Sequence, residues 1–165
     1  MMRFLAVLAV VLAPGAAVSA ELFEVSGPWV GEGLLATGAQ DPMQRGRCKV
    51  SIAPSENEVS VTGRCAVAGG ASEISLKAVR LGGGRVNAGF WSAATGQVVQ
   101  LAGKERGAQI ALTSTTDLMV DDAPFESRVT VREAEGEAFT IEQLMRPAGA
   151  EKWRMVMDMT FRAGK

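Results

Sequence analysis

Cys48 and Cys65 are the only cysteines of this chain, and three kinds of site use such a pair: a disulfide, a redox centre and a metal site. A redox pair is usually spaced Cys-x-x-Cys at the start of a helix, which lowers a thiol pKa, and these two lie much further apart. Zinc takes about four ligands, and the chain has no histidine to supply the others. The residue types therefore favour a structural disulfide.

The segment between the two cysteines has the pattern of a β-hairpin with a turn at residues 55–58. Partners across a hairpin share a constant sum of residue numbers. The register that opposes Cys48 to Cys65 also puts apolar residues on one face and polar residues such as Lys49 and Arg64 on the other. Directly opposed Cα atoms lie about 4.5–5.5 Å apart, which a disulfide accepts. The same register pairs Val50 with Gly63, Ile52 with Val61 and Pro54 with Val59.

Three alternating methionines near the C-terminus are the second candidate for chemistry. Met155, Met157 and Met159 would project from one face of a strand. Thioethers are soft ligands that suit Cu(I), but methionine also fills irregular core space and lines adaptable apolar pockets. Trp153 and Phe161 would share the methionine face. These two aromatic neighbours favour a core or pocket-lining role for the methionines over a metal site.

Residues that commonly perform catalysis are scarce. Histidine, the usual general base near neutral pH, is absent, and no nucleophile, phosphate-binding or dinucleotide-binding motif is present. The run Gly82–Gly84 lies between two predicted strands, which indicates a hairpin loop. Asp117, Asp121 and Asp122 fall in a loop that suits either Ca²⁺ binding or ordinary turn chemistry. We expect a protein that is not an enzyme and has no cofactor.

The first 20 residues have the features of a Sec-type signal peptide. Arg3 supplies a positive start, Phe4–Leu12 is an apolar run too short for a stable membrane span, and small residues precede a cleavage point after Ala20. An uncleaved N-terminal anchor is the alternative. No later segment has the ~18 consecutive apolar residues of a membrane helix. We expect export to a bacterial periplasm, or secretion, without a membrane anchor.

Residues 21–165 are long enough for one domain with its own core. Without Arg3 they carry 16 basic and 18 acidic residues, which is close to neutral. Nucleic-acid binding requires a basic face, and the chain has no block of like charge. We therefore expect no nucleic-acid partner and a monomer.

Short segments of period-two alternation are separated by regular turn signals, at intervals of about eight to twelve residues that are typical of a sandwich or barrel. Sequence neighbours should pair because the connections are short, and closing the sheet removes its open edges. We predict an all-β fold, a single antiparallel up-and-down β-barrel of about ten strands. One predicted strand puts Phe139, Ile141, Gln143 and Met145 on a single face. The strands span residues 28–36, 44–53, 58–67, 72–81, 85–92, 96–104, 108–117, 125–134, 137–146 and 152–162.

Residues 27–33 read Gly-Pro-Trp-Val-Gly-Glu-Gly and open the first predicted strand. This G-x-W-x-G-x-G pattern resembles the first strand of calycin barrels, which include lipocalins, fatty-acid-binding proteins and the nitrobindin-like barrels. The resemblance implies that Trp29 plugs one barrel end and that an arginine, Arg162 or else Arg154, packs against it. Nitrobindin-like barrels bind haem through a histidine. Since this chain has none, the resemblance extends to the fold and not to haem.

Two functions are compatible with such a barrel. The first is binding of a small apolar or amphipathic ligand in the interior. The second is interaction with a periplasmic protein by a barrel that its own side chains fill, because the chain also resembles small disulfide-bearing periplasmic inhibitors of secreted metalloproteases. In those inhibitors the N-terminal segment enters the protease; the matching residues 21–26 here contain Leu22 and Phe23, and would alternatively cover the barrel end. The residues predicted to line a cavity are Trp29, Ile52, Val61, Phe90, Phe139, Ile141, Met155, Met157 and Met159.

Overall fold

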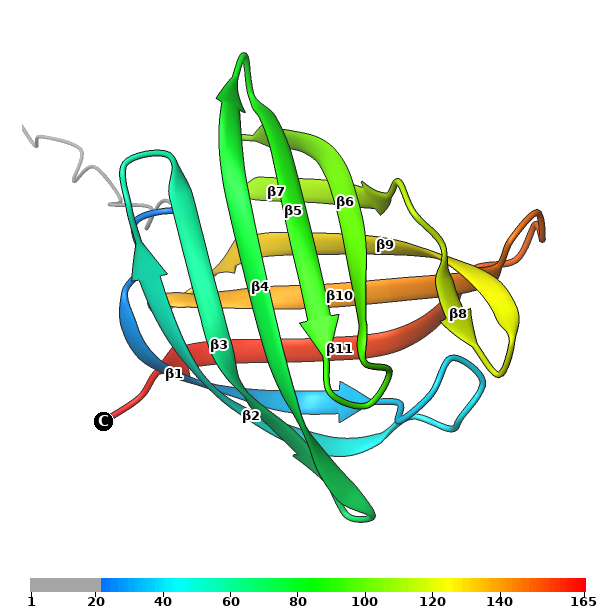
Figure 1. The fold of residues 1–165 in the computed structure, drawn as a ribbon. Helices are drawn as coiled ribbons and strands as arrows, with labels where there is room; N and C mark the ends of the chain where they lie inside the picture. The colour runs from blue at the N-terminus through cyan, green and yellow to red at the C-terminus, as the bar shows by residue number, and fades with distance from the viewer. Residues whose placement is uncertain (1–21) are drawn as a thin grey trace, which may run out of the picture.

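The computed structural model describes residues 22–165, which form β-strands and no helix (Figure 1). The predicted signal peptide at residues 1–20 and Glu21 lie outside the described residues. The all-β prediction is confirmed, as is the antiparallel up-and-down barrel of ten strands. The strands are β1 (Gly27–Leu35), β2 (Gln44–Pro54), β3 (Glu58–Val67), β4 (Gly70–Gly82), β5 (Arg85–Ser92), β6 (Gln97–Arg106), β7 (Gln109–Ser114), β8 (Leu118–Val120), β9 (Ala123–Ala134), β10 (Ala138–Pro147) and β11 (Arg154–Ala163).

Each barrel strand pairs with its neighbours in sequence, and β1 pairs with β11 to close the circle. The short β8 is the exception, since it pairs with the start of β9 and β7 pairs with the middle of β9. Figure 1 shows β3–β6 running steeply across β9–β11, so that two groups of strands face each other across the interior. The interior therefore lies between two opposed walls of strands.

The cysteine hairpin has the predicted register. Cys48 opposes Cys65 and forms a disulfide with it, with the two Cα atoms 4.0 Å apart. Val50 opposes Gly63, and Ile52 opposes Val61. The polarity pattern alone was sufficient to position the crosslink, because a shift by one residue would turn every apolar side chain of the hairpin outward.

The structure adds one strand that the sequence pattern did not reveal. The predicted strand 108–117 is shorter in the structure, where β7 ends at Ser114, and β8 follows as half of a tight hairpin with β9. Asp121 and Asp122 form its turn with positive φ values of 50° and 61°. Aspartate tolerates this left-handed conformation better than most residues, so the acidic residues here serve the turn.

Glycines of the first strand let β11 approach β1 closely. Gly31 lies opposite Phe161, and a Cβ at position 31 would come within 2.5 Å of that ring. A Cβ at Gly33 would collide with the backbone oxygen of Asp158. Trp29 of the same strand faces inward like Gly31 and Gly33. The centroid of its ring lies 5.0 Å from that of Phe139. The G-x-W-x-G-x-G pattern is thus a packing pattern, in which glycines make room for the aromatic cluster.

Candidate functional site

Eight inward-facing apolar residues of β3–β5 and β9–β11 are only partly buried, and we name them the inner apolar set. Four come from β3–β5 and four from the opposite wall, β9–β11. Val61, Leu76 and Phe90 form one cross-strand row, which continues at each end into a fully buried residue, Ile52 or Val99. Members of the set are Val61, Ile74, Leu76, Phe90, Val129, Val131, Ile141 and Met157.

Their partial exposure describes the interior. An inward side chain remains accessible only where the barrel's own side chains do not fill the space in front of it. Other inward residues are fully buried: Cys48, Val86, Met159 and Phe161 are at most 2% exposed. The inner apolar set is therefore the more exposed part of the inward face.

A polar residue, Gln143, lies among these apolar residues. Gln143 lies between Val129 and Met157 in a cross-strand row, so it shares the face of the inner apolar set. Its Nε2 donates to Ser127 Oγ at 3.0 Å, and Ser127 is 1% exposed. The backbone N–H of Ser127 donates in turn to Ser114 Oγ at 2.8 Å. This chain of hydrogen bonds holds the Gln143 amide against the neighbouring strand β9.

Charged residues close the barrel end at which β1 begins. Arg80 of β4 forms two hydrogen bonds to the carboxylate of Glu105 of β6, with Nε–Oε2 at 2.8 Å and NH2–Oε1 at 2.6 Å. The Phe23 ring covers this pair, with the Arg80 Cζ 4.2 Å from its centroid. Leu22 and Phe23 are 9% and 3% exposed. The N-terminal segment therefore packs onto the barrel as a cover.

The opposite end is covered by the β1–β2 connection. The Arg154 guanidinium donates to the backbone oxygen of Ala39 at 2.8 Å and also to that of Asp41. The backbone N–H of Ala36 donates to the Val156 oxygen at 2.8 Å. Ala39 is 5% exposed, which shows that the connection folds inward.

The prediction that Arg162 packs on Trp29 is wrong. Arg162 pairs with Val30, so it projects from the outer face of β11 and is exposed. Arg154, the second choice, lies at the other end of the barrel. The cation that stacks on an aromatic ring at the Trp29 end is Arg80, on Phe23. The physical idea of an arginine on a ring was sound, but the strand parity of Arg162 excludes it from the interior.

The prediction of three methionines on one face is also wrong, because a β-bulge interrupts β11. Gln143 opposes Met157, but the next residue, Leu144, opposes Met155, which leaves Val156 as the extra residue. Cross-strand partners share a face, so Met155 lies with Leu144 on the outside. Met157 and Met159 remain inside.

Trp153 lies directly before β11, two residues before Met155, and is on the same outer side as Met155. Its ring lies between two guanidinium groups, with the Cζ atoms of Arg128 and Arg146 at 4.1 Å and 4.4 Å from the ring. Arg146 also pairs with Glu126 at 2.6 Å. Trp153 is therefore part of an outer arginine cluster and not of the predicted methionine face.

The remaining predicted lining residues fall into two groups. Val61, Phe90, Ile141 and Met157 belong to the inner apolar set. The others face inward but are buried: Trp29, Ile52, Phe139 and Met159. Sequence reasoning missed Ile74, Leu76, Val129 and Val131 as lining residues, and the alternation of their strands was the signal that could have identified them.

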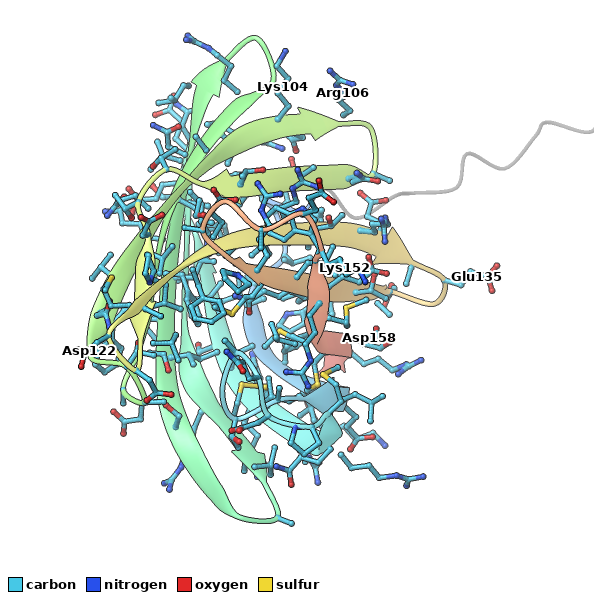
Figure 2. The ribbon with its side chains drawn as sticks, turned by 90° about the vertical axis from the view of Figure 1, so that its right-hand side faces the viewer. Lys104, Arg106, Asp122, Glu135, Lys152 and Asp158 are labelled. Atoms are coloured by element: carbon cyan, nitrogen blue, oxygen red, sulfur yellow. A yellow bond between two sulfur atoms is a disulfide. The ribbon has the colours of Figure 1, made fainter. Side chains whose placement is uncertain are left out.

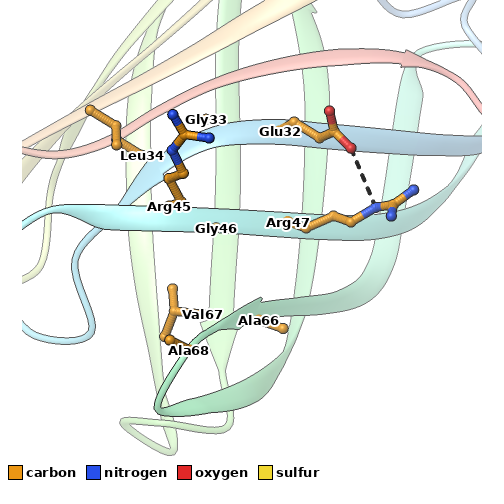
Figure 3. A pocket seen from close by; sticks show the side chains of 9 residues that line it. All are labelled: Glu32, Gly33, Leu34, Arg45, Gly46, Arg47, Ala66, Val67 and Ala68. Atoms are coloured by element: carbon orange, nitrogen blue, oxygen red, sulfur yellow. Dashed lines mark ion pairs between the residues drawn. The ribbon is translucent and has the colours of Figure 1, made fainter.

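Two open hollows lie outside the barrel, and neither contains a predicted lining residue. The larger has a volume of about 560 Å³ over β1–β3, where small residues leave space between Leu34, Arg45 and an exposed ion pair of Glu32 with Arg47 (Figure 3). The smaller, about 270 Å³, adjoins Ser72 and Ala94. The larger is lined by Glu32, Gly33, Leu34, Arg45, Gly46, Arg47, Ala66, Val67 and Ala68.

Other charged residues are exposed to solvent, among them Lys104, Arg106, Glu135 and Asp158 (Figure 2). Within residues 22–165, no three His, Cys, Asp or Glu side chains are placed to hold a metal ion together. The same part of the chain contains no helix long and apolar enough to cross a membrane.

Neither a protein-family model nor a curated protein sequence matches this chain.

Proposed function

We propose that this protein is an exported, non-enzymatic β-barrel that binds a small apolar or amphipathic molecule in its interior. The observation that carries the proposal is the inner apolar set. Eight inward apolar residues on two opposed walls are only partly buried although the barrel is closed. Burying apolar surface contributes about 25 cal/mol per Å², so an apolar guest would gain stability there.

The composition of this surface suits a ligand site. Such sites are mostly apolar, with a few polar groups that fix the orientation of the ligand. Phe90 and Met157 lie on opposite walls of the barrel. A methionine side chain adapts its shape to different ligands. Gln143 supplies the polar group. Both ends of the barrel are covered, so a ligand would enter when one cover opens.

Export and barrel class belong to the same proposal. The disulfide between Cys48 and Cys65 suits an oxidising compartment such as the bacterial periplasm. The signal-peptide features of residues 1–20 support export, with cleavage after Ala20. The G-x-W-x-G-x-G first strand supports a calycin-like barrel, in a form that does not ligate haem through histidine.

The alternative is a periplasmic interaction protein whose N-terminal segment enters a partner. That function requires Leu22 and Phe23 to leave the barrel. The burial of both residues, and the contact of Phe23 with Arg80, favour a cover for the barrel end instead.

Native mass spectrometry of the protein purified from its own periplasm tests the proposal. We expect a fraction of the molecules to carry a retained small molecule that leaves on organic extraction. A titration of the extracted protein with N-phenyl-1-naphthylamine, which fluoresces in apolar sites, should then saturate at one molecule per chain. A protein that retains nothing and gives no saturable fluorescence would contradict the proposal.

A further inference from the structure

The charge distribution inside the barrel restricts what the interior can bind. Four inward positions of the barrel strands carry charged residues: Arg80, Glu105, Glu133 and Arg154. Each lies at or near the end of its strand, and Arg154 opposes Met145, two residues from Gln143. Arg80 is paired with Glu105, and Arg154 is bonded to two backbone oxygens. Among the described residues, both inward cations therefore already bond acceptors of this chain, which leaves a carboxylate or phosphate ligand no unengaged cation.

Gln143 places an amide among the residues of the inner apolar set. Gln143 uses Nε2 to reach Ser127, and its Oε1 makes no hydrogen bond within the described residues. No buried side-chain nitrogen or oxygen in residues 22–165 lacks a partner, so this Oε1 must be accessible rather than sealed. A glutamine amide can also turn over, because Ser127 Oγ both donates and accepts. The free group is then neutral in either orientation.

The neighbours of this amide are apolar on both sides. Val129 and Met157 oppose Gln143 across the two adjacent strands, and Ile141 and Met145 lie two residues away on the same face. A ligand that reaches the amide therefore buries its body against hydrocarbon and sulfur. Its own polar group must be neutral, since an unpaired charge is costly to bury.

We infer that the interior selects an uncharged apolar molecule with one hydroxyl or similar neutral hydrogen-bonding group, which bonds to the side-chain amide of Gln143. This rests on the proposed function. It goes further by naming the ligand class and the residue that hydrogen-bonds the polar group of the ligand. Fatty acids and other amphipathic anions are excluded as preferred ligands, although their chains would fit the same apolar walls.

The test compares decan-1-ol with decanoate at pH 8 as displacers of N-phenyl-1-naphthylamine from the full, oxidised protein. The two displacers have equal chain length and differ in charge. We expect decan-1-ol to displace the probe at a concentration at least about tenfold lower, because bound decanoate must be buried unpaired or take up a proton. Gln143→Met should weaken decan-1-ol about three- to tenfold, the range of one lost hydrogen bond.

Gln100→Met is the matched control, since Gln100 is exposed on the outer face of β6 and should leave both affinities unchanged. Circular dichroism of both variants would show that the barrel is retained. If the probe binds but decanoate displaces it as well as decan-1-ol does, or if Gln143→Met has no effect, the inference is overturned and the proposed function stands. If the probe does not bind at all, both are overturned.

Discussion

The guanidinium of Arg80 lies 4.2 Å from the centroid of the Phe23 ring, and the same guanidinium grips the carboxylate of Glu105 with two hydrogen bonds. Phe23 comes from the segment before β1, whereas its two partners lie at the ends of β4 and β6. This contact attaches the start of the chain to the far side of the barrel. It gives the N-terminal segment a role in closing the interior.

Phe23→Ala should lower the free energy of unfolding by about 3–5 kcal/mol, because truncating a buried phenylalanine removes apolar contacts and leaves a cavity. Urea unfolding monitored by tryptophan fluorescence measures the change. Glu24→Ala is the matched control at an exposed neighbour, with an expected effect within about 0.5 kcal/mol. Equal effects at positions 23 and 24 would show that the segment does not cover the barrel.

Deleting residues 22–26 separates the two functions that the sequence left open. As a cover, the segment should stabilise the barrel and slow the escape of a bound probe, so its loss should speed probe dissociation in stopped-flow fluorescence. An inhibitor would instead lose a protein partner while its stability and its probe kinetics stay unchanged.

Replacing both Cys48 and Cys65 with alanine should cost about 3 kcal/mol, the chain-entropy value for a loop of this size. The bridge closes a separation of 17 residues between neighbouring strands. The denaturation midpoint should fall while probe affinity in the folded state is retained, since neither cysteine belongs to the inner apolar set. Loss of binding by the folded variant would indicate that the pair takes part in function.

Two glycines of the first strand should differ in their tolerance of alanine. Gly33→Ala should be the more damaging change, because its Cβ would meet the backbone of Asp158. Gly31→Ala meets the side chain of Phe161, which can move. Thermal unfolding should rank the variants in that order, with Gly69→Ala as the neutral control because a Cβ there would have no atom within 4 Å. The reverse order would show that β1 and β11 pack differently.

The bulge in β11 makes Met155 and Met157 a matched pair. Met157→Gln should weaken N-phenyl-1-naphthylamine about tenfold, because it places an amide among the inner apolar set. Met155→Gln should leave the affinity within a factor of about two, since that side chain lies on the outer face. Similar losses from both variants would restore the expectation that the methionines share one face.

The polarity pattern was sufficient to predict the barrel and the cysteine register. It did not predict the β-bulge in β11, because the pattern there does not change when the strand register shifts by one residue. The sequence around Val156 is apolar at positions 155, 156 and 157, so an extra residue changes the face of Met155 without disturbing the pattern. The Phe23–Arg80 contact could not be predicted from the sequence for a different reason. It joins residues far apart in the chain, and a single arginine near a strand end gives no sign of its partner.

Gln143 shows the opposite case, because its inward position was present in the predicted alternation with Ile141 and Met145. The role of Gln143 could not be predicted from that alternation, because it depends on Ser127 from β9 and on the two walls facing each other. The lining of the interior was likewise only partly predictable. Alternation identifies inward residues, but three-dimensional packing determines which of them remain accessible.

A methyl-resolved NMR titration with decan-1-ol tests the central claim most directly. If the interior binds the ligand, the methyl signals of Val61, Leu76, Val129 and Ile141 should shift together with one saturable curve. Val98 and Leu34, which are 54% and 42% exposed on the outer face, should remain unchanged. Shifts confined to Leu34 and Val67 beside the outer hollow, with the inner methyl signals unmoved, would contradict the account.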